Sequence, residues 1–263
     1  MLRTGCIATG ALVMQYSSKS IIIQTLIVFL FFVGWQLVGS LKVVSPLFLA
    51  VPSQILSGSW FSDFPQFIPY FQVTVSEVAA TLGLAALIGI AGGMILGSND
   101  FVYRILEPFL AWGYSIPKII FFPLFILLFG LGSLPVIAQA TVNAVFVFLL
   151  NTTTGVRGVE WDLLKLSKSL GMNRFQRYRK IILPSMIPVE FSAIRLGLIH
   201  AVIGVLLAEV IMSSLGAGML IDNLSYTFHV VQLYSVISLI SVVMIALNFV
   251  LLRIERRLTF WRV

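Results

Sequence analysis

The stretch GVRGVEWDLLKLSKSLGMNRFQRYRKIILP, residues 155–184, is a basic island between long apolar segments. Seven of the seventeen Lys and Arg of the chain lie in it: Arg157, Lys165, Lys168, Arg174, Arg177, Arg179 and Lys180. The flanking segments carry almost no charge. Lys and Arg are retained preferentially in cytoplasmic loops, so the island indicates a cytoplasmic contact surface on a membrane protein.

The spacing inside the island predicts two helices joined by a sharp turn. Leucines recur on one face of residues 161–170 and lysines on another: Leu163, Leu166 and Leu170 against Lys165 and Lys168. Gly171 then occupies the place of a helix-ending residue with positive φ. Asn173 and Gln176 have the spacing of a capping box, which predicts a second helix running toward Leu183 and Pro184.

The composition assigns the chain to the polytopic membrane proteins. Hydrophobic residues make up 59% and charged residues 10%, with a mean hydropathy of +1.03. Apolar runs of about 20 residues, enough to span roughly 30 Å of hydrocarbon, recur along it. We therefore expect an all-α membrane fold of about six transmembrane helices, near residues 21–39, 74–97, 105–130, 133–153, 187–212 and 231–252.

The distribution of basic residues predicts the orientation. With the N-terminus inside, fourteen of the seventeen Lys and Arg are cytoplasmic, Lys42 is external, and Lys118 and Arg195 lie in spans. The expected order is a cytoplasmic segment 1–20, a permease domain 21–252 with an external loop 40–73 and a cytoplasmic loop 155–185, and a basic cytoplasmic tail 253–263. The net charge of +7 then reflects orientation and contact with anionic membrane lipid, and no nucleic-acid partner is expected.

Two spans carry specific packing signals. Ala85, Gly89, Gly93 and Gly97 form a stripe of small residues at four-residue spacing, which predicts close contact with a neighbouring helix. Pro117 and Pro123 predict a kinked or broken third span. Within lipid, the carbonyls that the prolines free must face protein or a wet cavity, so this span is a candidate lining of a pathway. Alternatively, Lys118 between the prolines only reaches toward the cytoplasmic headgroups.

Polar groups at membrane depth supply further candidates for a pathway. Glu209 could contact a backbone turn at Gly216 and Gly218, hold a neighbouring helix, or face the pathway. His200 has no cluster of carboxylates or thiols around it in sequence, so no metal site is expected. The candidate pathway residues are Tyr114, Pro117, Pro123, Asn143, His200 and Glu209, with Gly216 and Gly218 as an external gate.

The sequence holds no motif for covalent chemistry. It lacks a phosphate-cradling glycine loop ending in Lys and Ser or Thr, a pair of histidines at helical spacing with a glutamate, and a Gly-x-Ser-x-Gly elbow. Cys6 is the only cysteine, so no internal disulfide is possible. We expect the chain not to be an enzyme, and any energy for transport to come from a partner or an ion gradient.

The ordered motifs resemble those of the membrane-spanning permease subunits of bacterial ABC importers, in the nitrate, sulfonate and taurine group. Gly171, followed by Ile181, Leu183 and Pro184, matches the family's cytoplasmic loop, written EAA, three residues, G, nine residues, I, x, L, P. Similar stretches are SIPKIIFFPLFILLFGLG from Ser115, NTTTGV from Asn151, AEVIMSSLGAGMLI from Ala208, and a basic tail with Trp261. Where the family has Glu, Ala, Ala, this chain has Lys165, Leu166 and Ser167.

The resemblance implies a type I importer permease fold and a set of partners. These are a second permease copy, two cytoplasmic ATP-binding subunits that bind ATP and Mg, and an extracytoplasmic solute-binding protein in the bacterial inner membrane system. The chain itself would bind no cofactor. It also implies ATPase-coupling residues in the loop: Trp161, Asp162, Leu163, Lys165, Leu166, Lys168, Leu170, Gly171 and Pro184.

Two other mechanistic classes remain open at this stage. A secondary transporter driven by an ion gradient would favour inverted repeats with paired broken helices, and only one span is plainly broken in the sequence. An intramembrane enzyme would need a polar catalytic cluster at a common depth, which the sequence does not show. The resemblance suggests a small metabolite as cargo, such as nitrate, a sulfonate or taurine.

Overall fold

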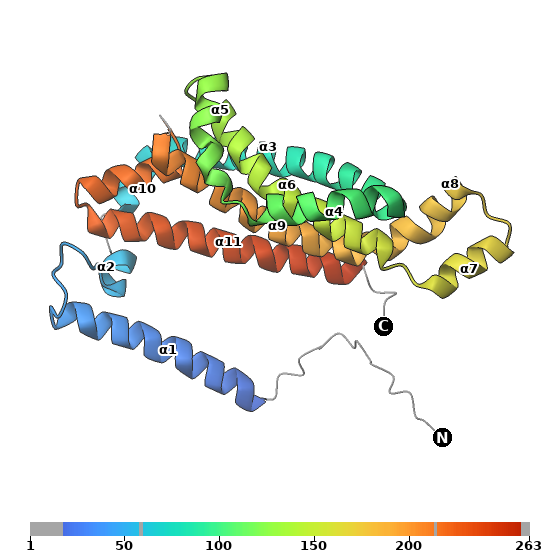
Figure 1. Cartoon of the computed structure of the whole chain (residues 1–263). Helices are drawn as coiled ribbons and strands as arrows, with labels where there is room; N and C mark the ends of the chain where they lie inside the picture. The colour runs from blue at the N-terminus through green and yellow to red at the C-terminus, as the bar shows by residue number, and fades with distance from the viewer. Residues whose placement is uncertain (1–17, 58–59, 213–214, 259–263) are drawn as a thin grey trace. The chain divides into compact units, whose positions relative to one another are not determined.

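The computed structural model describes residues 18–57, 60–212 and 215–258, and this described part is helical without a strand. It divides into two compact units, one ending at Gly58 and one beginning at Ser59. Figure 1 colours the chain from its N-terminus to its C-terminus and labels its main helices. Residues 1–17 of the predicted N-terminal segment and residues 259–263 of the predicted tail lie outside the described residues, and residues 253–258 form the last turns of α11 (Val230–Leu258).

The first unit consists of α1 (Ser18–Ser40) and α2 (Pro52–Ser57). Side chains from Ile21 to Phe32 are apolar except at Gln24 and Thr25 and are exposed around the helix, as in a lipid-facing span. Trp35 donates from Nε1 to the Ala50 carbonyl at 3.0 Å. This bond folds the loop after α1 back along the helix. The first predicted span is confirmed by residues 20–40 of α1, which are long and apolar enough to cross a membrane.

The second unit is a helical bundle with α6 (Ser133–Arg157) between α3 (Trp60–Ser98) and α9 (Leu183–Met212), and with α11 (Val230–Leu258) packed on α9 and α3 (Figure 1). Shorter elements complete it: α4 (Asp100–Ser115), a 3₁₀ turn η1 (Lys118–Phe121), α5 (Phe122–Phe129), α7 (Trp161–Ser169), α8 (Arg174–Arg177), a π-helical turn η2 (Tyr178–Ile182) and α10 (Ala217–Tyr226). The core between α3, α6 and α9 is built from small side chains around one aromatic ring: Ala85, Ala144, Phe148, Ala193 and Ala201.

The expectation of about six spans is confirmed. Among the described residues, five helices are long and apolar enough to cross a membrane, and a sixth results if α4 and the η1–α5 segment count as one span bent by 84°. This bend confirms the predicted break at Pro117. Lys118 lies at the bend and donates from Nζ to the Tyr114 carbonyl at 3.0 Å, so it satisfies one of the freed carbonyls.

The helix that contains the second predicted span, near residues 74–97, is longer than that span. The helix α3 begins at Trp60 and includes Pro65 and Pro69, which the sequence placed in an external loop. Phe67 is buried in a cluster with Leu220, Leu224 and Val236, so packing on α10 and α11 favours helix over the local effect of the prolines. The fifth helix also starts earlier than residue 187, since helical structure is continuous from Arg174 to Met212.

The stripe of small residues on α3 packs against α6, as predicted. A side chain at Gly89 would meet Phe148 and the Val145 carbonyl, and one at Gly93 would meet Thr152 and the Leu149 carbonyl. Gly204 on α9 approaches Ala140 of α6 in the same way. Because lipid supplies no hydrophobic force between spans, this close approach of backbones is a main source of their association.

We predict that Gly93→Ala destabilises the bundle by about 1–3 kcal/mol, because its Cβ would overlap backbone and side-chain atoms of α6. The matched control is Gly83→Ala on the same helix, where no atom lies within 4 Å of the added Cβ. Thermal unfolding of the purified protein in detergent measures both. Equal unfolding temperatures for the two variants would contradict the packing described here.

Candidate functional site

The helix α7 displays an uncovered apolar face. Leu163, Leu166 and Leu170 are 37%, 54% and 63% exposed, although leucine normally prefers burial. On its other side, the ammonium groups of Lys165 and Lys168 lie 5.7 and 5.8 Å from the centroid of the exposed Trp161 ring. Asp162 forms a loose ion pair with Lys165 at 3.8 Å. A short helix with this amphipathic exposure is suited to contact another protein.

A Schellman turn ends α7 at the predicted glycine. Gly171 has φ of 67°, the left-handed conformation that glycine adopts without strain. Its N–H donates to the Lys168 carbonyl at 3.0 Å, and the Met172 N–H donates to the Ser167 carbonyl at 3.0 Å. This is the paired bonding of a Schellman motif, and Ser167 beneath it is fully buried. The turn therefore fixes the direction in which the chain leaves α7.

The second helix of the loop starts with the predicted capping box. Asn173 accepts from the Gln176 N–H at 2.8 Å, and the Gln176 side chain accepts from the Asn173 N–H at 3.0 Å. The sequence did not indicate the π-helical turn Tyr178–Ile182 that follows. It lies directly before Pro184, whose ring would clash with the Lys180 carbonyl in a regular α-helix. The widened turn thus accommodates the proline of the loop motif.

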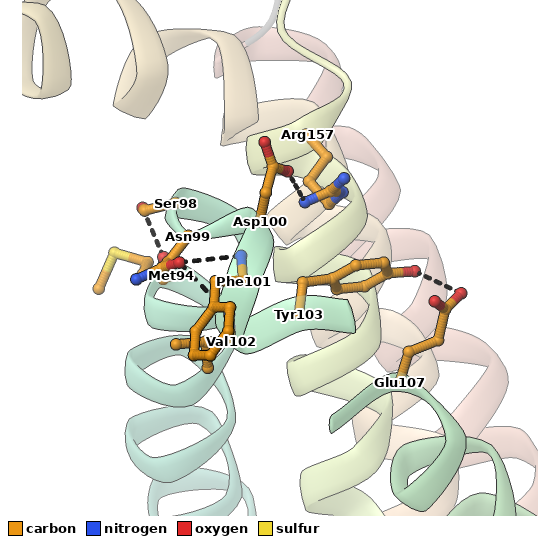
Figure 2. Close-up of polar contacts among 9 residues, drawn as sticks. All are labelled: Met94, Ser98, Asn99, Asp100, Phe101, Val102, Tyr103, Glu107 and Arg157. Carbon is orange, nitrogen blue, oxygen red and sulfur yellow. Dashed lines mark hydrogen bonds and ion pairs between the residues drawn. The ribbon is translucent and has the colours of Figure 1, made fainter. Parts of the chain in front are cut away.

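A polar cluster holds the base of the loop, where α6 ends at Arg157 (Figure 2). Arg157 pairs with Asp100 at 2.7 Å, and its guanidinium lies 4.1 Å from the centroid of the Tyr103 ring. Asn99 caps α4 by accepting from the N–H groups of Phe101 and Val102. The cluster joins the α3–α4 corner to the last turn of α6, a few residues before α7.

A second contact ties the same corner to the other end of the loop. The hydroxyls of Ser98 at the end of α3 and Tyr178 at the start of η2 lie 3.0 Å apart. Sequence reasoning missed these anchoring residues, although Asn99 followed by Asp100 carries the signature of a helix start. The segment that leads into α7 and the segment that leads out of it are therefore both attached to the α3–α4 corner.

The predicted pathway residues do not gather at one place in the described structure. Tyr114, Pro117 and Pro123 lie around the break of the third span and are exposed. Asn143 donates from Nδ2 to the His200 carbonyl at 2.9 Å, which joins α6 to α9 without using the imidazole. His200 Nδ1 lies 2.9 Å from the Leu196 carbonyl of its own helix. These contacts leave the pathway role of these residues a prediction.

Glu209 contacts the glycine turn, one of the three alternatives that the sequence left open. It is only 1% exposed, and its Oε2 accepts from the Gly218 N–H at 2.7 Å. Its Oε1 accepts from the Thr74 hydroxyl at 2.6 Å, and that hydroxyl accepts from the Ala217 N–H at 2.7 Å. Gly216 has φ of 136°, and a Cβ there would overlap the Glu209 carboxyl. Glu209 thus joins α9 to α3 and to the start of α10.

The bundle with its broken span and two-helix loop has the fold of type I ABC importer permeases. A chain of an inward-facing structure of the MetNI methionine ABC transporter superposes with a TM-score of 0.65 at 21% identity, covering 72% of this chain and 94% of that chain. At this identity the likeness establishes the fold only.

The chain belongs to the family described as binding-protein-dependent transport system inner membrane component, whose model matches residues 85–260. SsuC of Bacillus subtilis (strain 168), named for aliphatic sulfonates transport, is 30% identical over 87% of this chain and 83% of its own length. TauC of Escherichia coli (strain K12), a taurine transport system permease protein, is 26% identical over 86% of this chain and 85% of its own length.

These findings identify the chain as a multi-span permease subunit of an ABC importer, which is a transport protein. A permease of this family implies ATP-hydrolysing and solute-binding partners. The relatives give no support to the secondary-transporter alternative. The expected resemblance to the nitrate, sulfonate and taurine group is confirmed.

We predict that Lys118→Met destabilises the bend of the third span by about 1–3 kcal/mol, because the Tyr114 carbonyl loses its donor. Lys118→Arg keeps donors at this position and serves as the control. The readout is modification of a cysteine introduced at Ser115, in membranes, by a water-soluble thiol reagent. Equal labelling rates in the Met and Arg variants would show that Lys118 does not hold the bend.

Proposed function

We propose that two copies of this chain form the membrane path of an importer for a small metabolite, such as a sulfonate, taurine or nitrate. An extracytoplasmic solute-binding protein delivers the solute, and two ATP-binding subunits hold the ATP and Mg and supply the energy. The permease itself binds no cofactor and catalyses no reaction, in keeping with the absence of nucleotide motifs from its sequence. The names of relatives that cover most of the chain support this cargo class.

The exposed leucine face of α7, held by the Gly171 turn, is the observation that carries the coupling role. Leu163, Leu166 and Leu170 stay 37–63% exposed in the described chain and would be buried in a groove of the ATP-binding subunit. Because α7 is attached through the Asp100–Arg157 pair to α4 and α6, a displacement of α7 is transmitted to the spans. ATP-driven closure of the two ATP-binding subunits would thereby change the access of the path.

The loop 155–185 and both termini, residues 1–20 and 253–263, lie on the cytoplasmic side of the bacterial inner membrane, in line with the excess of Lys and Arg there. The broken third span and α9 line the path. The Gly216–Gly218 turn forms the external gate, because Glu209 and Thr74 converge on it from two spans.

The first test of this function is reconstitution with an ATP-binding subunit and a solute-binding protein in liposomes. We expect Gly171→Val to uncouple ATP hydrolysis from uptake while the protein still inserts, since φ of 67° costs a β-branched residue about 1–2 kcal/mol. Nothing lies within 4 Å of a Cβ at Gly171, so the effect arises from the backbone alone. Gly171→Asn, which tolerates this conformation, is the control.

Wild-type uptake by Gly171→Val, with full ATP coupling, would contradict the turn as a coupling device. Uptake by the permease alone, driven by a sodium or proton gradient, would contradict the ABC mechanism for this chain.

The charge of Lys165 predicts the chemistry of the partner groove. Lys165 stands where the family has Glu, and its side chain is 61% exposed, so an acidic groove on the ATP-binding subunit would complement it. We expect Lys165→Glu to weaken binding of that subunit by roughly tenfold or more, because it opposes like charges. Lys165→Arg should bind normally. Pull-down at two salt concentrations measures this, and an unchanged affinity in the Glu variant would exclude an acidic groove.

A further inference from the structure

Two acidic side chains meet inside the bundle at the end where α10 begins. Glu77 comes from α3 and Glu209 from α9, and each is only 1% exposed. The two carboxyls are direct electrostatic neighbours. The importer mechanism described above does not require a second carboxyl beside Glu209. The role of Glu77 therefore needs a separate explanation.

The hydrogen bonds of the two side chains differ. Glu209 accepts at both oxygens, from the Thr74 hydroxyl at 2.6 Å and from the Gly218 N–H at 2.7 Å. These two donors suit an ionised carboxylate. The polar neighbours of the Glu77 carboxyl are Glu209 and the Ser133 hydroxyl, yet no contact in the described structure has hydrogen-bond geometry to either of its oxygens. An ionised Glu77 would therefore be a buried charge without compensation.

No cation offsets the pair within the described residues. None of the ion pairs found there includes Glu77 or Glu209. Other titratable groups on the elements packed around the pair are not among its electrostatic neighbours. They include Tyr70 on α3, Arg157 at the far end of α6, His200 on α9, Asp222 on α10, Lys118 on η1 and Tyr234 on α11.

We propose that Glu77 and Glu209 form a proton-binding site, in which Glu77 holds one proton and donates its O–H to the ionised carboxylate of Glu209. One proton removes the repulsion between two adjacent carboxylates and gives Glu77 the hydrogen bond that it otherwise lacks. The shared proton then binds α3 to the part of α9 that holds the Gly216–Gly218 turn. This site goes beyond the import function and does not depend on the identity of the cargo.

The proposal fixes the sign of the pH dependence. At neutral pH the folded protein holds a proton that an ordinary glutamate in the unfolded chain has already released, so stability must fall as pH rises. For one proton, the unfolding equilibrium constant rises about tenfold per pH unit wherever the folded protein keeps the proton and the unfolded chain does not. Deprotonation at alkaline pH places two charges together and loosens the end of the bundle that carries the glycine turn.

The test is thermal unfolding of the purified full chain in detergent as a function of pH, together with the infrared band of protonated carboxylic acids. We expect wild type to lose stability with rising pH and Glu77→Gln to lose this dependence, since the amide donates to Glu209 without a titratable proton. Glu77→Gln should also lose intensity in the carboxylic-acid band at neutral pH. Glu190→Gln, which replaces a half-buried acid toward the other end of α9, should retain the slope that Glu77→Gln removes.

Three results would overturn the proposal. The first is an equal pH slope in wild type and Glu77→Gln. The second is wild-type stability that does not fall with pH, which decides the question even if Glu77→Gln fails to fold. The third is stabilisation by sodium or potassium ions with no carboxylic-acid band assignable to Glu77, which would show that a metal cation neutralises the pair. Loss of transport in Glu77→Gln with the slope abolished would support a proton that also serves the gate.

Discussion

Close contact of backbones along α3, α6 and α9 holds the bundle together and aligns its polar groups. Gly89 and Gly93 of α3 leave room for Phe148 and Thr152 of α6, and Gly204 of α9 leaves room for Ala140. With no water to drive apolar spans together, such small residues allow dense packing and fix the lateral register of the helices. That register brings Ser98 close to Tyr178, Asp100 to Arg157 and Thr74 to Glu209.

The two ends of the bundle consequently carry different polar arrangements. At one end, Asp100 and Arg157 are partly exposed and connect the base of α7 to the α3–α4 corner (Figure 2). A pair of this kind contributes little stability, typically about 0–1 kcal/mol, and acts mainly by orienting the chain that leads into the loop. At the other end, Glu77 and Glu209 are buried and lack a basic partner among the described ion pairs. An importer needs a firm connection to its ATP-binding subunits and a membrane end that can open. The Asp100–Arg157 pair suits the first need, and the Glu77–Glu209 pair suits the second.

Features set by local backbone chemistry were predictable from the sequence. The left-handed Gly171, the Asn173 capping box and the break at Pro117 each follow from one or two residues, and the structure has all three. Features set by tertiary contact were not. Phe67 packs in a cluster that keeps α3 helical through Pro69, and Asp100 meets Arg157 across 57 positions of the chain. The proximity of Glu77 and Glu209 depends on the register of two antiparallel helices, which hydropathy alone does not define.

A cryo-electron microscopy structure of the permease assembled with its ATP-binding subunits would show where α7 lies during coupling. The leucine face of α7, at Leu163, Leu166 and Leu170, should be buried in a groove of the ATP-binding subunit, with Gly171 still in its left-handed turn. A complex that transports solute while this face lies in lipid or free in solvent would contradict the claim that α7 transmits the closure of the ATP-binding subunits to the membrane spans.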